Sequence, residues 1–403
     1  MLRAVGRGGA VLFFAFIAMA PPALAASCRN TGDFQHWLAA FKQEAASRGV
    51  SQRAIAAASP YMTYSQRIIN IDRGQRFFQQ SFLEFSDKLV DRNRLQSGAA
   101  HIQKYRALFD REQREFGVPA AVITAFWGLE SDFGANMGKD QALPSLTTLA
   151  YDCRRPDMFR KHLLGALQLI DRGDLRPEEM IGSWAGELGQ TQFMPDEYMA
   201  HAVDYDGDGK RNLLRSVPDV IGSTGKYLVH LGWRRGEPWL QEVRVPEKLP
   251  WQEADLTIQH PRSYWLRLGV TAAHGEKLPA DNLPTSLVLP MGRFGPAFFA
   301  YPNFKSYIGW NESLTYALTA AYYATRLAGA PPMNRGRRDI PKLSTEQVFQ
   351  LQRLLAQQGY KVGEIDGKVG SAVRSAVRSA QMKLGLPADS YPTVELLDRL
   401  QRR

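Results

Sequence analysis

Glu130 is the residue of this sequence best suited to proton-transfer chemistry. Pro119 fits the first turn of a helix. Val122, Phe126 and Glu130 then fall four positions apart, so that a carboxylate ends an apolar stripe. Apolar neighbours and the negative end of a helix dipole both raise the pKa of a carboxyl, which can then serve as a general acid at neutral pH. The alternative is a solvated glutamate at a helix end, which is the commoner state of an arbitrary Glu.

A second chemical pattern lies in the segment DYDGDGKRN, which begins at Asp204. Its alternating aspartates, with glycine at the sharp turn, reproduce the start of an EF-hand loop, and carboxylate oxygens suit a hard cation. The twelfth position is Arg215 instead of the usual bidentate glutamate, and the alternative is a solvated Asp and Gly turn. We predict a structural calcium site, with ligands from Asp204, Asp206, Asp208, Lys210 and Asn212.

The elements that must position these groups are expected to be mainly helices. Apolar residues recur every three or four positions from Asp33 to Asp171, with long helical stretches at Phe77 to Val90 and Ile102 to Phe116. Prolines punctuate the chain after Trp233, and this predicts a small β insertion at about 234–300.

Two segments of that insertion suit strands, Gln241 to Val245 and Ser286 to Leu289, and helical spacing returns at Leu314 to Leu327. The fold class is therefore α+β, mainly α.

A linker and a small helical module are expected at the carboxyl end. The stretch 331–342 is rich in proline and arginine without apolar periodicity, which is typical of an exposed linker. Beyond it, 343–403 should form three helices, in which Ser344 opens the first with a capping-box signature, Ser371 caps the second and Thr393 starts the third. A unit this small leaves no room for an enclosed active site, so its expected role is binding.

Four motifs in the same order resemble the membrane-bound lytic murein transglycosylase B family. They are AFWGLESDFG at 125–134, SWAGELGQTQFMP at 183–195, the acidic loop with its following helix at 201–233, and 302–317 with WNESLTYA. The resemblance covers about 33–330 and implies a lysozyme-like catalytic domain over 26–330. The terminal unit, with LQRLLAQQGY and IDGKVG, resembles a peptidoglycan-binding domain of the three-helix type.

The resemblance implies a non-hydrolytic cleavage of peptidoglycan. In this family a single glutamate, which matches Glu130, protonates the leaving oxygen of the β-1,4 bond between N-acetylmuramic acid and N-acetylglucosamine. The same residue then takes the proton of the sugar's C6 hydroxyl, so that a 1,6-anhydromuramoyl end forms without water. A glycosidase, in contrast, normally needs two carboxylates.

Further site residues carry over from the family individually. Asp219 resembles the late acidic ligand of the family's longer metal loop, and Phe193 also has the character of an ordinary core residue. The expected substrate-binding residues are Ser183, Gln192, Phe193, Asn311, Tyr316, Arg154 and Arg155, the two arginines for the carboxylates of the stem peptide.

Two departures from the family pattern bear on the reaction. Trp310 stands where some members have tyrosine, which leaves stacking on a sugar face as its expected contact. Glu187 lies where some relatives carry alanine, and opposite Glu130 it would make a hydrolytic muramidase plausible. A third alternative is a noncatalytic peptidoglycan-binding scaffold.

The amino-terminal residues predict export. Arg3 and Arg7 precede an apolar run from Ala10 to Ala20, and two prolines and the small-residue triplet at 23–25 follow it, which is the pattern of a signal peptide over 1–25. Its removal takes two bases and no acids, so the formal charge falls from +10 to +8. We expect a periplasmic monomer that binds peptidoglycan and not nucleic acid, needs no catalytic cofactor, and has other cell-wall enzymes as candidate partners.

The chain has two cysteines, Cys28 and Cys153. In an oxidising compartment an even number usually pairs, so we predict a disulfide between them. The alternative is a lipid anchor on Cys28, but the residue three positions before it is Ala25 instead of the leucine usual in lipidation signals.

Overall fold

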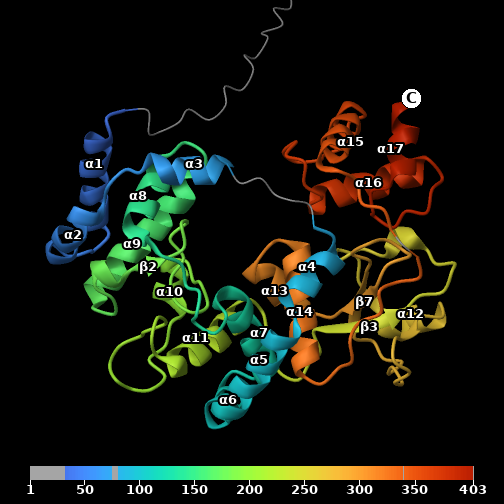
Figure 1. Ribbon diagram of the computed structural model, residues 1–403, viewed down its shortest axis with the longest axis horizontal. Coiled ribbons are helices and arrows are strands. Elements are labelled where there is room, and N and C mark those ends of the chain that lie inside the picture. The colour runs from blue at the N-terminus through green and yellow to red at the C-terminus, as the bar shows by residue number, and fades with distance from the viewer. Residues whose placement is uncertain (1–31, 75–79, 339, 403) are drawn as a thin grey trace, which may run out of the picture.

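The computed structural model describes residues 32–74, 80–338 and 340–402. The predicted signal peptide and Cys28 lie outside these residues, so export and the disulfide to Cys153 stay predictions. Figure 1 shows a helical group on the left, central helices, a sheet at the lower right and a three-helix module at the upper right. The class is α+β, mainly α, as expected. Among the described helices, none combines the length and apolar composition needed to cross a bilayer.

The helical group on the left of Figure 1 is centred on α8 and α9. Its core includes Phe41, Leu146 and Leu167, and a two-stranded antiparallel ribbon of β1 and β2 adjoins it. The elements are α1 (Phe34–Ser47), α2 (Gln52–Ala58), α3 (Gln66–Gly74), β1 (Asp140–Gln141), α8 (Ala142–Tyr151), α9 (Pro156–Arg172), β2 (Ile181–Gly182) and α10 (Pro195–His201).

The central helices surround α7, which is apolar on every side and is therefore buried. Val122, Ile123 and Phe126 are completely inaccessible, and α14 packs along them. The elements are α4 (Phe82–Leu89), α5 (Arg92–Lys104), α6 (Arg106–Glu115), α7 (Ala120–Ser131), α11 (Val217–His230), α13 (Phe304–Trp310) and α14 (Leu314–Leu327).

Two expected helices differ from the structure. The helix predicted over Ile102 to Phe116 is broken at Tyr105, whose backbone ends α5, because α5 packs on α7 while α6 packs on α11. The helix predicted from Phe77 starts at Phe82, where Ser81 and Glu84 form a capping box, and residues 75–79 lie outside the described chain.

The sheet is antiparallel, with strand order β4-β6-β7-β3-β5. Leu240 pairs with Ala300 and Leu287 with Phe299. Leu287 and Phe299 face a separate core around Trp265. Both predicted strands are present with ends shifted by one or two residues, and the elements are β3 (Leu240–Arg244), β4 (His260–Pro261), α12 (Arg262–Arg267), β5 (Thr271–Ala272), β6 (Pro284–Val288) and β7 (Ala297–Ala300).

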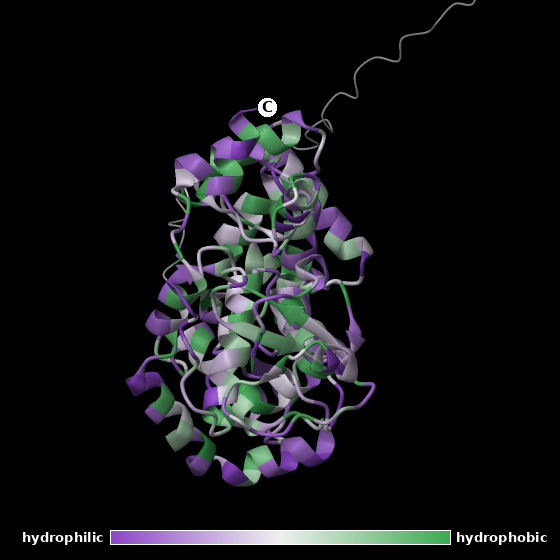
Figure 2. Cartoon of the chain, turned by 90° about the vertical axis from the view of Figure 1, so that its right-hand side faces the viewer, coloured by the Kyte–Doolittle hydropathy of each residue, from purple (hydrophilic) through white to green (hydrophobic). Residues whose placement is uncertain are grey.

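The carboxyl-terminal module consists of α15 (Thr345–Gln357), α16 (Ser371–Lys383) and α17 (Val394–Gln401). The capping box at Ser344 is confirmed, and Thr393, which was expected to start the third helix, is its N-cap. The prediction for Ser371 is wrong: Gly370 is the N-cap, and Ser371 is the first helical residue, so its hydroxyl is one position too late to cap. In Figure 2 the helices at the two ends of the molecule alternate hydrophilic and hydrophobic residues, as amphipathic helices do.

The stretch 331–342 has no regular secondary structure in its described part, but ion pairs fix it to α4. Arg335 pairs with Asp87 at 2.9 Å, and Lys342 pairs with Glu84 at 2.7 Å. The module itself contacts the sheet region, where Arg374 donates to the Leu289 carbonyl at 2.7 Å. The module is therefore docked on the rest of the protein.

Candidate active site

Glu130 lies in the last turn of α7, and its carboxyl is half-buried. Two donors from the other side of the site bind the same oxygen: the Trp310 indole donates to Oε1 at 2.8 Å, and the Tyr316 hydroxyl donates to it as well. Burial raises the pKa of Glu130, the hydrogen bonds from Tyr316 and Trp310 lower it, and the charge of Glu187 raises it, so that together these effects place it at about 7.

Trp310 is held in place by an aromatic cluster. Its ring stacks on Phe126 at 4.2 Å between centroids and lies against Phe193 at 5.5 Å and Tyr227 at 5.3 Å. The sequence interpretation gave Trp310 only a stacking role and missed its hydrogen bond to Glu130. The sequence did offer a signal for this hydrogen bond: Trp310 carries an N–H donor and lies in the same motif as Tyr316.

The motif 183–195 forms a tight turn beside Glu130. The Ser183 hydroxyl accepts from the amides of Ala185 and Glu187, each at 3.2 Å, and the Ser183 amide donates to the Glu187 carbonyl at 3.0 Å. Burial raises the pKa of Glu187, whose charge acts on Glu130. The structure therefore brings the second carboxyl close enough for the two to interact.

Gln192 and Phe193 support this turn from within. Gln192 has a left-handed backbone, with φ of 52°, and its side-chain amide donates to the carbonyls of Gly189 at 2.8 Å and Met137 at 3.2 Å. Phe193 is only 2% exposed. Phe193 therefore lies in the core behind Trp310, in keeping with its character as an ordinary core residue, and its contact with substrate stays a prediction.

The remaining expected substrate-binding residues divide between two places. Asn311 is exposed just after Trp310, where its side-chain oxygen accepts from the Ser313 amide at 2.9 Å. Arg154 and Arg155 instead pair with the buried carboxylate of Asp72 at 2.9 and 2.6 Å. The contact of these arginines with a stem peptide stays a prediction.

The acidic loop gathers three of its expected ligands. Carboxylate oxygens of Asp204, Asp206 and Asp219 lie within 4.8 Å of one another, and Asp219 is fully buried. Asp208 is outside this group and accepts from the Lys210 amide at 2.8 Å. Three carboxylates this close repel one another unless a cation neutralises them, so the residues fit a hard divalent ion.

The Asn212 side chain faces the loop backbone instead of the carboxylate group. Its oxygen accepts from the amides of Leu214 and Arg215 at 3.2 and 3.1 Å.

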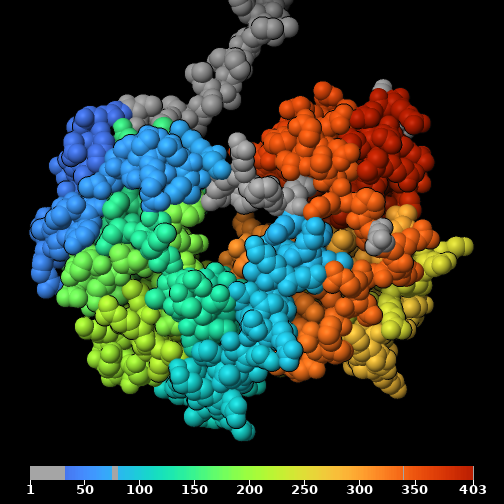
Figure 3. Space-filling view, in the orientation of Figure 1, coloured from blue at the N-terminus to red at the C-terminus, as the bar shows by residue number. Residues whose placement is uncertain are grey.

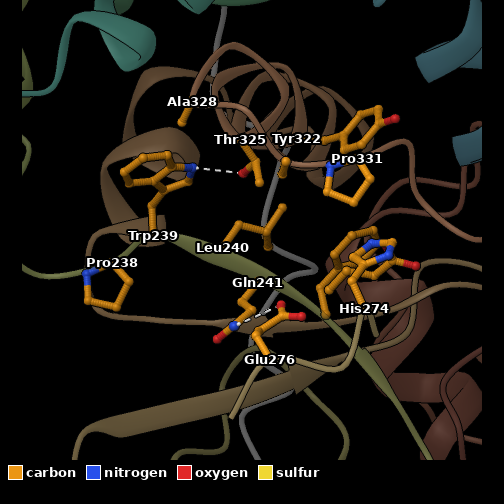
Figure 4. Close-up of a pocket in the computed structure, with 13 residues that line it drawn as sticks. Pro238, Trp239, Leu240, Gln241, His274, Glu276, Tyr322, Thr325, Ala328 and Pro331 are labelled. Carbon is orange, nitrogen blue, oxygen red and sulfur yellow. Dashed lines mark hydrogen bonds and ion pairs between the residues drawn. The ribbon is translucent and has the colours of Figure 1, made fainter. Parts of the chain in front are cut away.

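A cavity of about 420 Å³ lies elsewhere, between β3 and the end of α14 (Figure 4). Trp239 donates to the Ala321 carbonyl and the Thr325 hydroxyl, each at 3.1 Å, and Gln241 donates to Glu276 at 3.4 Å. These polar groups are thus paired with one another, whereas the acid at the end of α7 has a raised pKa of about 7. Figure 3 shows the surface hollowed between the green helical group and the orange and blue segments beside it.

Comparison with known proteins agrees with this geometry. Residues 33–325 match the family described as "Transglycosylase SLT domain", and residues 344–400 match "Putative peptidoglycan binding domain". The chain is 29% identical over 239 residues to membrane-bound lytic murein transglycosylase B of Escherichia coli (strain K12), covering 59% of this chain and 65%, just under two thirds, of that relative's length.

Two solved structures are similar throughout most of the fold. SltB3 from Pseudomonas aeruginosa, in complex with NAG-anhNAM-pentapeptide, has a TM-score of 0.84 and 37% identity, covering 92% of this chain and 99% of that one. Lytic transglycosylase Slt35 of Escherichia coli, in complex with calcium, has a TM-score of 0.62 and 25% identity, covering 75% and 94%. The chain therefore belongs to the transglycosylase SLT domain family, and it carries a domain of the peptidoglycan-binding family at its carboxyl end.

Proposed function

We propose that this protein is a periplasmic lytic transglycosylase that cleaves the β-1,4 bond between N-acetylmuramic acid and N-acetylglucosamine with Glu130 as its single acid and base. The observation that carries the proposal is the Glu130 carboxyl at the end of α7, with a pKa of about 7 and two donors on one oxygen. A group with that pKa can give up a proton and take one back near neutral pH. The complex of the SltB3 relative with an anhydro-sugar peptide supports the same product.

The two donors determine which oxygen carries the proton. Because Trp310 and Tyr316 both donate to Oε1, that oxygen must accept, and the acid proton resides on Oε2. Oε2 then protonates the bridging oxygen as the bond to the muramoyl C1 breaks, and the bonding electrons leave with that oxygen. The carboxylate next takes the proton of the C6 hydroxyl while O6 bonds to C1, which closes the anhydro ring and restores Glu130.

Hydrolysis is the second candidate, because a specific observation favours it. Glu187 has a half-buried carboxyl whose charge raises the pKa of Glu130, so it could activate a water as a general base. Such a base must be ionised to act, whereas burial raises the pKa of Glu187. The Glu187 backbone is also fixed to Ser183 by two hydrogen bonds.

Digestion of purified sacculi followed by mass analysis of the fragments tests the proposal. Anhydromuramoyl ends are expected, and they should persist in a Glu187→Gln variant. Reducing ends that disappear in Glu187→Gln would instead establish the muramidase. Absence of any released fragment would establish a noncatalytic scaffold, in which the carboxyl-terminal module retains binding to sacculi.

We further propose that the acidic loop binds calcium through Asp204, Asp206 and Asp219. The cluster of three carboxylates supports this, and the Slt35 relative was solved with calcium. The ion would neutralise the loop and has no step in the cleavage. Calorimetric titration with Ca²⁺ of protein that has been stripped of metal by a chelator measures the affinity. The Asp206→Asn variant, titrated in the same way, should bind more weakly.

Periplasmic export, the monomeric state and recruitment by other cell-wall enzymes stay predictions. The intact mass of the mature protein, isolated from the periplasm, would give the cleavage position near Ala25. The same mass would reveal a lipid on Cys28, and its change on reduction and alkylation would report the disulfide to Cys153.

A further inference from the structure

Gln190 is a buried polar residue, 6% exposed, that the proposed reaction does not use. Its side-chain oxygen accepts from the Trp127 indole at 2.8 Å, and its backbone carbonyl accepts from the Ser131 hydroxyl at 2.5 Å. Trp127 precedes Glu130 by one helical turn, and Ser131 follows it directly. Gln190 thus holds the end of α7 on both sides of the acid.

The donors of Gln190 bind a different segment. Its backbone amide donates to the Leu213 carbonyl at 2.8 Å, and its side-chain amide donates to the Leu214 carbonyl at 3.1 Å. These two leucines lie inside the acidic loop, between Asn212 and Asp219. All four hydrogen-bonding groups of Gln190 are therefore occupied, two by the catalytic helix and two by the loop.

The loop in turn fixes the two carbonyls through its own acids. Asp219 accepts from the Asn212 amide at 2.7 Å, and Asn212 accepts from the Leu214 amide at 3.2 Å. On the other side, Ser216 donates to Asp206 at 2.6 Å. A change in the acids, by ion binding or substitution, is therefore transmitted to the backbone that Gln190 contacts.

The packing leaves Gln190 little freedom to absorb such a change. A Cβ added to Gly134 would lie 2.7 Å from the Gln190 side-chain oxygen, and one added to Gly189 would lie 2.8 Å from Leu213. Both glycines have positive φ, 89° and 78°, which a side chain would strain. Gln190 is therefore closely packed both on the α7 side, at Gly134, and on the loop side, where Gly189 contacts Leu213.

We propose that Gln190 is a positioning residue that couples the acidic loop to Glu130. Anything that orders the loop, a bound divalent cation above all, orders the last turn of α7 through Gln190. By reciprocity, a rigid α7 end increases the affinity of the loop for its cation. The catalytic part of this inference rests on the proposed function, whereas the coupling itself does not.

The indole resonance of Trp127 in a ¹H–¹⁵N spectrum tests the coupling without substrate. A Trp127→Phe variant assigns the resonance. In the wild-type protein, Ca²⁺ or the exposed substitution Asp206→Asn should move it. A Gln190→Met variant keeps the two backbone hydrogen bonds and loses the two side-chain ones, so both shifts should be much smaller than in the wild type, and the Ca²⁺ affinity should fall about fivefold or more. The same substitution at the exposed Gln357, in α15, should change neither the resonance nor the affinity.

Two results would overturn the proposal: a Trp127 resonance that ignores both Ca²⁺ and Asp206→Asn, or one that responds equally with and without Gln190. If Gln190→Met fails to fold, Gln190→Glu is the second variant. It keeps the acceptor for Trp127 and loses the donor to Leu214, so it should reduce the response to Ca²⁺ while the Trp127 hydrogen bond remains.

Kinetics add a readout that loss of stability does not mimic. Gln190→Met should lower kcat with little change in KM, and adding Asp206→Asn should lower it no further. Effects on kcat that multiply in the double variant would contradict the coupling. A protein that yields no anhydro products, yet has a coupled Trp127 resonance, would refute the proposed function and leave this inference standing.

Discussion

Two glutamates of this protein have raised pKa values for the same reason and differ in everything around them. Glu130 and Glu112 are both desolvated by their neighbours, which raises the pKa to about 7 and about 9, respectively. Glu112 lies in α6, fully buried, and its carboxyl oxygens have no hydrogen-bond partner among the described residues. Glu130 has two donors and a turn beside it that brings a second acid. The difference teaches that burial supplies the shift, while hydrogen bonds bring the pKa back to where an acid can work.

The largest effect is expected from Glu130→Gln. The amide can neither give nor take the proton, so kcat on sacculi should fall about a thousandfold. Glu247→Gln, an exposed change in the sheet region, is the matched control and should retain full activity. Full activity of Glu130→Gln would remove the residue from the mechanism.

Tyr316→Phe should make Glu130 more like Glu112. Loss of a donor to the charged form raises the pKa of Glu130, so the alkaline limb of the pH–rate profile should move upward by about one unit. An unchanged profile would show that the hydroxyl does not bind the carboxylate during turnover.

Trp310→Phe separates the indole N–H from the aromatic packing. The ring can still stack on Phe126, so the fold should persist, while the lost hydrogen bond should again move the alkaline limb upward, by up to one unit. Trp239→Phe, in the cavity of Figure 4, is the control with the same chemical change away from the acid. If Trp310→Phe and Trp239→Phe had the same pH–rate profile, the role of Trp310 would be packing only.

Glu112→Gln should alter stability instead of activity. Because the folded pKa lies above the unfolded value of 4.5, the native state binds the extra proton between these values, and stability falls as pH rises from about 4.5 to 9. Each pH unit in that window costs about 1.4 kcal/mol of unfolding free energy, and the variant should lose this slope. Thermal denaturation at pH 5, 7 and 9 measures it, and a slope equal to that of the wild type would place Glu112 in contact with water.

The sequence predicted the parts of the site that depend on local order. The position of Glu130 at the end of an apolar stripe and the DxDxD spacing each lie within a short stretch of sequence, so they can be recognised without knowledge of the fold. The hydrogen bond of Trp310 depends on α13 packing against α7, 180 residues apart in the chain. Gln190 and Glu112 were missed for the same reason, since their partners are brought together by tertiary packing.

Local rules also misplaced one feature. The periodicity from Ile102 to Phe116 is real on both sides of Tyr105, but each half buries its apolar face against a different helix, so one helix becomes two. The packing of Phe193 against Trp310 and Tyr227 joins residues far apart in the chain, so no local rule could predict it. The α+β class, in contrast, could be predicted from the periodicity of apolar residues and from the prolines that separate short segments after Trp233.

The docked segment 331–342 has a consequence for how a glycan strand would be handled. A free segment of that length would let the module range over about 20 Å. Ion pairs to α4 and the contact of Arg374 with the Leu289 carbonyl instead hold the module at one offset from Glu130. A glycan strand bound to the module would therefore reach Glu130 at a constant number of sugars from the bound position. High salt weakens the exposed ion pairs, so it would make the number of sugars between the module and the cleaved bond more variable without changing the reaction at Glu130.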